Sequence, residues 1–178
     1  MLLCSRTDQT LNFPDFRAAE RTFQLLTQAA GRAGRGGTPG IVLIQTINPD
    51  HYAIQYAAGH DYDAFCDKEL RFRKWMNYPP FTSVANLVVR HDHLERALQY
   101  AGELGQWFDK NKSKGLRVMG PAAAPIVRLK CDYRYHFVLK SDSRERLNAS
   151  LRAMLKYSAE RKIPRSNLIV DVDAVSLL

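Results

Sequence analysis

The second half of the sequence alternates strand-like and helix-like patterns in an order that few folds accommodate. Residues 82–90 (TSVANLVVR) form a β-branched run of strand length, and 93–111 repeats apolar residues at helical spacing. Residues 125–140 alternate like a hairpin that turns around 130–133. The remaining patterns are a short strand, a second helix and a last strand, at 116–120, 143–161 and 167–173.

The order is therefore strand, helix, strand, strand, helix, strand, with an extra strand available at 125–130. This order predicts a split βαβ, ferredoxin-like arrangement, in which two helices cover one face of an antiparallel sheet. The fold class expected for the whole chain is α+β, with this small βαββαβ domain at 81–178.

The first fifty residues resemble a piece of an α/β domain. Asp15 is the expected N-cap of a long helix, and 41–46 (IVLIQT) is apolar on both faces, as in a buried strand. Fifty residues are too few to bury the hydrophobic core of such a domain on their own. We therefore expect Phe16, Phe23, Leu26 and the strand to be more exposed than in a complete lobe.

Two helices are expected between this segment and a pair of prolines, at 50–58 and 61–76. Asn48-Pro49 is a helix-start signature, and the prolines of 78–81 (YPPF) forbid continuation. The expected parts are the C-terminal portion of an α/β lobe, a helical connector and a basic α+β domain, at 1–50, 51–80 and 81–178.

The positive charge gathers in the last part. The chain carries +8 with a pI near 9.6, and residues 81–178 hold 17 basic against 10 acidic side chains. A basic module indicates a polyanionic partner such as nucleic acid, although a solvated surface is the simpler alternative.

The thiols, histidines and apolar runs point to no metal or membrane site. Cys4, Cys66 and Cys131 are far apart and form no CxxC, which fits a reducing, cytoplasmic setting. His91-Asp92-His93 has no further ligand nearby, so we favour a helix cap over a metal site. No stretch approaches the about 20 apolar residues of a membrane span.

Two arginines end the first long helix. Gln28, Arg32 and Arg35 fall at i, i+4 and i+7 on one side, and glycines at 31 and 34 leave room near the backbone. Guanidinium groups suit phosphate oxygens, whereas the alternative is a favourable interaction with the helix dipole.

Gln28-x-x-Gly31-Arg32-x-x-Arg35 resembles motif VI of superfamily 2 helicases. The resemblance extends from 8–36 through PGIVLIQTINPDHYAIQYA, YPPF and GPAAAPIVRLKCDYRYHFVLK to VDVDAVSLL, and is to the C-terminal part of the PriA replication-restart helicases (primosomal protein N′). It implies a 3′→5′ DNA helicase in replication restart and primosome assembly, whose partners are branched or forked DNA, single-strand-binding protein and primosome proteins. It also implies that Gln28, Gly31, Arg32 and Arg35 contact ATP phosphates in a complete motor.

The sequence also departs from that family in several motifs. The sequence has no GxxxxGK[ST] loop, no DExH-type motif and none of the family's zinc-binding cysteines, and Arg6 stands where an acidic residue is expected. We therefore expect no catalytic residue in the isolated chain and no ATP hydrolysis by it. ATP and Mg²⁺ are expected only in the complete helicase.

The expected hairpin carries the candidate nucleic-acid residues. Simple alternation divides 126–140 into an apolar face and an outward basic face. The expected apolar face holds Val127, Leu129, Tyr133, Tyr135, Phe137 and Leu139. The expected basic face holds Arg128, Lys130, Arg134, His136 and Lys140. The resemblance implies that this face tracks DNA phosphates, whereas a solvated sheet face is the alternative.

Two other functions remain open from the sequence. One is a stand-alone basic module that binds nucleic acid, including RNA, because small α+β sheets recur in such proteins. The other is a protein-interaction domain.

Overall fold

The computed structural model describes residues 2–4, 7–33 and 41–174. The chain forms two compact units, Met1–Met76 and Asn77–Leu178. The expected connector at 51–80 lies almost wholly in the first unit. That unit contains β1 (Leu2–Cys4), α1 (Thr7–Leu11), α2 (Ala18–Ala33), β2 (Val42–Ile44), α3 (Tyr52–Ala58) and α4 (Tyr62–Trp75).

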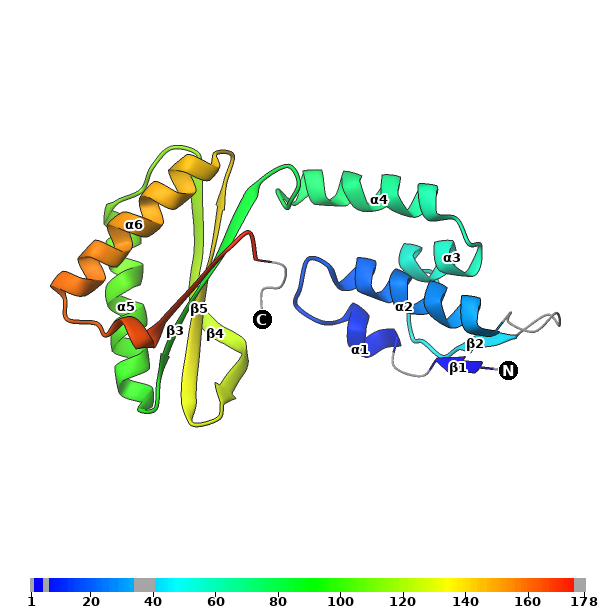
Figure 1. Ribbon diagram of the computed structural model, residues 1–178, viewed down its shortest axis with the longest axis horizontal. Helices are drawn as coiled ribbons and strands as arrows, with labels where there is room; N and C mark the ends of the chain where they lie inside the picture. The colour runs from blue at the N-terminus through cyan, green and yellow to red at the C-terminus, as the bar shows by residue number, and fades with distance from the viewer. Residues whose placement is uncertain (1, 5–6, 34–40, 175–178) are drawn as a thin grey trace. The chain divides into compact units, whose positions relative to one another are not determined.

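The second unit has the predicted βαββαβ order. Its sheet has the strand order β4-β5-β3-β6 with antiparallel neighbours, and α5 and α6 lie on one face of it (Figure 1). The elements are β3 (Ser83–His91), α5 (Leu94–Lys110), β4 (Leu116–Leu129), β5 (Asp132–Ser141), α6 (Arg144–Glu160), a 3-10 turn (Arg165–Asn167) and β6 (Leu168–Val172). The α+β fold class and the split βαβ arrangement are confirmed.

The core of the second unit lies between the sheet and its helices. Leu87, Phe137 and Leu139 project from the central strands and are fully buried. Leu104 and Met154 meet them from α5 and α6 and are also fully buried. The alternate residues of β3 and β5 therefore face away from the helices, and that helix-free face carries the polar side chains considered below.

The first unit buries its aromatic residues better than the sequence predicted. Phe16, Phe23 and Leu26 are only 9%, 4% and 2% exposed. Phe23 stacks on Phe65 of α4 with ring centroids 4.1 Å apart, and Ile54 of α3 joins the same cluster. The expected exposure of these side chains is therefore wrong, because α3 and α4 supply the neighbours.

The strand at 41–46 is shorter than predicted, and it is exposed as expected. β2 pairs in parallel with β1, its one strand neighbour in the described part of the chain. Ile41 and Leu43 are 62% and 47% exposed. A two-stranded sheet covers neither face of this segment fully, so apolar side chains that suit a buried strand remain exposed.

The helices α2 and α3 each begin two residues later than predicted. Asp15 accepts a hydrogen bond from the Arg17 backbone N–H (3.0 Å), but α2 itself begins at Ala18. His51 caps α3 instead of Asn48, since its Nδ1 accepts from the Ala53 N–H (3.2 Å). In α3 the capping side chain thus comes from the residue directly before the first turn.

A network of charged and polar side chains joins α2, α3 and α4. Glu20 accepts from Arg17 (2.5 and 3.0 Å) and from Arg73 (2.6 Å). Arg73 also donates to Glu69 (2.7 Å), which accepts from the Tyr52 hydroxyl (2.6 Å). The hydrogen bond from Arg17, opposed by burial and helped by Arg73, lowers the pKa of Glu20 to about 2.

This network predicts acid sensitivity in the first unit. Because the pKa of Glu20 is lowered on folding, its stabilising contribution is present above its ordinary value of 4.5 and is lost as the pH falls towards about 2. Glu20→Gln should cost about 2 kcal/mol at neutral pH and flatten this acid dependence. Amide hydrogen exchange of α2 between pH 2 and 6 measures both effects. Asp67→Asn, at an exposed position of α4, is the control, and an unchanged acid profile in Glu20→Gln would contradict the account.

Candidate nucleic-acid interface

The β4–β5 hairpin closes through a two-residue turn. Leu129 pairs with Asp132 and Arg128 pairs with Tyr133, which leaves Lys130 and Cys131 in the turn. Lys130 adopts a left-handed backbone conformation with φ of 54°. A short hairpin loop needs such a residue so that the chain can reverse within two positions.

This register contradicts the predicted faces of the hairpin. Residues directly opposite one another in an antiparallel pair share a face, so Arg128 lies with Tyr133. The Arg128 guanidinium stands 5.1 Å from the centroid of the Tyr133 ring. Leu129 correspondingly shares its face with Asp132 and Arg134. The prediction failed because it carried one alternation through a turn that exchanges the faces.

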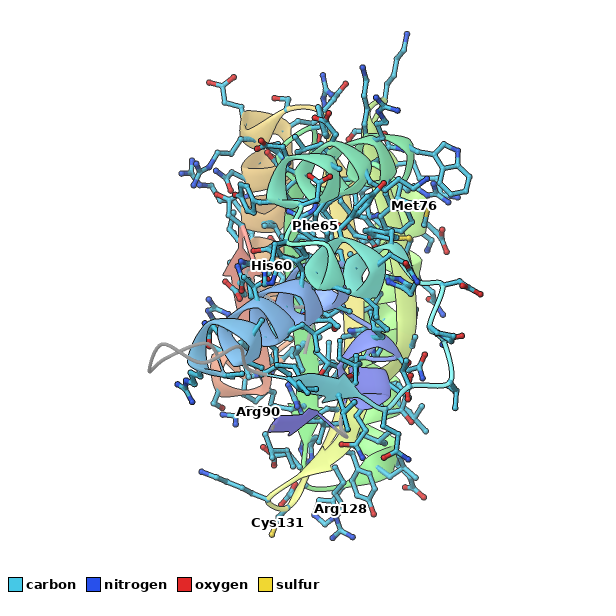
Figure 2. The ribbon with its side chains drawn as sticks, turned by 90° about the vertical axis from the view of Figure 1, so that its right-hand side faces the viewer. His60, Phe65, Met76, Arg90, Arg128 and Cys131 are labelled. Atoms are coloured by element: carbon cyan, nitrogen blue, oxygen red, sulfur yellow. The ribbon has the colours of Figure 1, made fainter. Side chains whose placement is uncertain are left out.

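Arg128 and Lys130 form an exposed basic tip on the hairpin. Both side chains are exposed, and Figure 2 shows Arg128 beside Cys131 at the end of this hairpin. We call Arg128 and Lys130 the basic tip. Its two cations can approach a phosphate backbone without rearrangement of the sheet, and contacts of surface cations with phosphates give mostly sequence-independent affinity.

The other three candidates lie on the helix-free face and are not outward. Arg134 and Lys140 are 8% and 7% exposed, and His136 is half-buried. Burial, and then the charge of Arg134, lowers the pKa of His136. The expectation of one outward basic face is therefore wrong, and neutralising Arg134 or Lys140 would alter the interior of the unit.

Two polar atoms on this face have no hydrogen-bond partner within the described part of the chain. They are Asn86 Oδ1 and His136 Nδ1. Asn86 sits opposite Val138, diagonally between His136 and Lys140. The centre of the helix-free face is thus polar rather than simply a second apolar core.

A further basic residue, Arg117, lies on the same face as Lys140, although its sequence position did not indicate this. Arg117 of β4 is exposed and pairs directly with Lys140 of β5. Its position follows from the pairing of β4 with β5 across an irregular register, which sequence spacing does not reveal. The sequence does show three lysines shortly before Arg117, at positions 110, 112 and 114, and these could have indicated a basic surface at the start of β4.

The motif VI residues that the structure describes lie at the end of α2. Gln28 and Arg32 are exposed, and they are four residues apart on one side of the helix. Among the described residues, and apart from the chain neighbours and the backbone of the helix itself, no atom lies within 4 Å of a Cβ added at Gly31. Arg35 lies outside the described residues. Two of the expected phosphate-contacting side chains are therefore accessible together.

A cavity in the first unit has an unsuitable lining for nucleotide phosphates. It has a volume of about 360 Å³, and His60 is the one residue with a polar or titratable side chain in its lining. The lining consists of Leu26, Ala30, Val42, Ile44, Ala57, Ala58 and His60. A phosphate chain needs several donors or cations, so this cavity does not replace a phosphate loop.

Neither a metal cluster nor a membrane span is found in the described ranges. Among residues 2–4, 7–33 and 41–174, no three His, Cys, Asp or Glu side chains are grouped to hold a metal ion. The His91 Nδ1 instead accepts from the His93 backbone N–H at 2.9 Å. No described helix is long and apolar enough to cross a bilayer.

Comparison with known proteins decides the family. Residues 74–175 match the family model described as "Primosomal protein N C-terminal domain". The chain belongs to this family. The match covers the whole described sheet of the second unit and both of its helices, and the predicted resemblance to the C-terminal part of PriA is confirmed.

Curated relatives match the first unit as well. Replication restart protein PriA of Bacillus subtilis is 40% identical over 166 residues, which cover 93% of this chain and 20% of the relative. The proteins of the same name from Borreliella burgdorferi and Haemophilus influenzae are 33% and 35% identical. They cover 93% and 96% of this chain, and 24% and 23% of the relatives. The chain thus spans about a fifth to a quarter of the length of these relatives.

Proposed function

We propose that this chain acts in replication restart and primosome assembly, as the C-terminal portion of a PriA-type 3′→5′ DNA helicase that binds branched DNA. The observation that carries the proposal is the match to replication restart proteins over more than nine-tenths of the chain. The positive excess of residues 81–178 supports a role in holding DNA.

The basic tip is the proposed DNA contact of the second unit. Arg128 and Lys130 are exposed, whereas Arg134 and Lys140 are buried and His136 is half-buried. Arg128 is also steadied by the Tyr133 ring. A cation held over an aromatic ring loses less side-chain freedom when it meets a phosphate.

In the first unit, Gln28, Gly31, Arg32 and Arg35 are the proposed contacts to ATP phosphates in a complete motor. The exposed positions of Gln28 and Arg32 and the open space at Gly31 support this role. Mg²⁺ and the remaining phosphate contacts would come from residues beyond this chain, because the sequence has no phosphate loop or DExH-type motif.

The DNA-binding proposal is tested by salt dependence. We expect Arg128→Ala/Lys130→Ala to weaken binding to a forked DNA and to flatten the slope of log affinity against log salt by roughly 0.7–0.9 per lost phosphate contact. Fluorescence anisotropy over a salt series measures this, with single-stranded DNA and RNA in parallel.

The matched control removes two exposed cations elsewhere. Arg152→Ala/Lys156→Ala deletes the same charge from α6. If the tip variant and this control shift the salt line equally, the tip makes no specific contact. A preference for RNA over forked DNA would instead favour the stand-alone RNA-binding module.

A further inference from the structure

One side of α4 carries aromatic and basic side chains that the core of the first unit does not use. Phe65 and Glu69 of this helix meet α2 and α3 and are buried. Lys68, Phe72 and Trp75 fall at i, i+4 and i+7, a spacing that places them along one side of the helix, and all three are exposed. We call these three residues the α4 stripe.

The two aromatic rings of the α4 stripe lie in water rather than in a core. Trp75 is 77% exposed and Phe72 is 38% exposed. Their ring centroids are 6.5 Å apart and the ring planes are inclined by 58°, so the rings are neighbours but Phe72 does not stack on the indole. The second tryptophan of the chain, Trp107, is instead half-buried and stacks on Tyr157. Trp75 therefore offers an aromatic surface to a partner.

Lys68 gives the α4 stripe a positive charge. No acidic residue lies three or four positions from it along α4. Within the described part of the chain Lys68 forms no ion pair, whereas Arg73 of the same helix is paired with two glutamates. Arg71 lies on the flank of the stripe and has Asp67 four residues before it, a spacing at which opposite charges offset each other. Lys68 is thus the uncompensated cation beside the two rings.

We propose that the α4 stripe binds single-stranded DNA, with one base stacked on the Trp75 ring and a neighbouring phosphate close to Lys68. Every base has an aromatic face, so stacking on an indole needs no particular sequence. The charge of Lys68 favours a polyanion, and the exposed rings favour one whose bases are accessible. In a duplex the bases stack on each other, so the stripe should prefer a single strand. Lys68 and Trp75 are seven residues apart, about 10.5 Å along the helix axis, so a short strand can reach both.

This site goes beyond the proposed function and does not depend on it. The α4 stripe belongs to the first unit, whereas the basic tip belongs to the second. A single strand can stack on Trp75 whether or not Arg128 and Lys130 contact forked DNA. The two sites therefore need separate readouts.

Trp75 can serve as its own reporter, because the chain contains two tryptophans. In a Trp107→Phe variant of the full chain Trp75 is the single tryptophan, and a base stacked on its ring should quench its fluorescence. The probe is an oligothymidylate of about ten nucleotides, and a duplex of the same length is the comparison. In Trp75→Phe, which keeps Trp107, the same titration should leave the fluorescence nearly unchanged.

The affinity of each variant is measured by the anisotropy of a labelled oligothymidylate over a salt series. Trp75→Leu keeps an apolar side chain but removes the ring, so it should weaken binding about tenfold without changing the slope of log affinity against log salt. Lys68→Ala should instead flatten that slope by about 0.7, the value for one phosphate contact on a single strand. Leu70→Ala is the matched control, because Leu70 is an exposed apolar residue on another side of α4.

The outcomes separate the α4 stripe from the basic tip. Quenching of Trp75 that persists in Arg128→Ala/Lys130→Ala supports the stripe, even if the tip fails its own test. The proposal would be overturned if the oligothymidylate does not quench Trp75, or if Trp75→Leu binds it as tightly as the unaltered chain. Stronger quenching by the duplex, or by an acidic peptide, than by the single strand would also overturn it, since the stripe would then be a surface for another partner.

Discussion

In a complete helicase that carries this segment, Arg35→Ala is expected to lower ATP hydrolysis by on the order of a hundredfold or more. A guanidinium that reaches the γ-phosphate stabilises charge that develops in the transition state, and alanine removes it without replacing that charge. Arg32→Ala should also lower hydrolysis. Steady-state hydrolysis with saturating DNA measures the effect.

The fold should survive this change, since no core residue of the first unit is altered. Arg71→Ala, an exposed arginine of α4, should hydrolyse ATP normally. The isolated chain should not hydrolyse ATP at all, because motif VI, as we interpret it, would only supply charge to a nucleotide bound elsewhere. Normal hydrolysis by Arg35→Ala would remove the motif VI interpretation.

The second large effect is expected from the core of the second unit. Phe137 is fully buried, and its ring centroid lies 5.5 Å from that of Phe108 on α5. Phe137→Ala should lower the free energy of unfolding by about 3–5 kcal/mol, through lost burial and the cavity that remains. That loss is a large share of the about 5–15 kcal/mol that stabilises a typical domain.

Denaturant unfolding followed by circular dichroism measures this loss. Ile126→Ala is the matched control, because Ile126 belongs to the same sheet but is 42% exposed. Its unfolding free energy should change by less than about 0.5 kcal/mol. Equal effects of the two variants would show that Phe137 is not central to the core.

The sequence predicted the second unit well because its signals are local. Leu104 and Phe108 repeat at helical spacing on α5, and both are buried as that spacing requires. Phe137 and Leu139 alternate on β5 and face the helices. The order of strands and helices then left few topologies to choose from.

The hairpin was mispredicted because pairing depends on turn geometry. The two-residue turn at Lys130 and Cys131 sets the register, and no periodic pattern reports it. The bend of β4 at Gly120 was missed for the same reason. Gly120 has φ of +115°, and a Cβ there would approach the His136 carbonyl oxygen to 2.6 Å, so a side chain is excluded at this position.

The sequence identified basic residues of the hairpin, but it did not predict correctly which of them are exposed. The tip cations Arg128 and Lys130 are exposed as expected, but Arg134 and Lys140 are buried on the helix-free face. Arg117, which pairs with Lys140, was not identified. The basic excess can be counted from the sequence. The partner of a residue on the neighbouring strand depends on the strand register, which the sequence pattern did not reveal.

The most direct test of the central claim is nuclear magnetic resonance of the isotope-labelled full chain, titrated with a forked DNA. The account predicts that the largest chemical-shift changes fall at the hairpin tip, at Arg128, Lys130 and the ring of Tyr133, and that they fade as salt is raised. Shifts that avoid the tip, or a spectrum unchanged by the DNA at low salt, would contradict the claim that this tip is the DNA contact of the second unit.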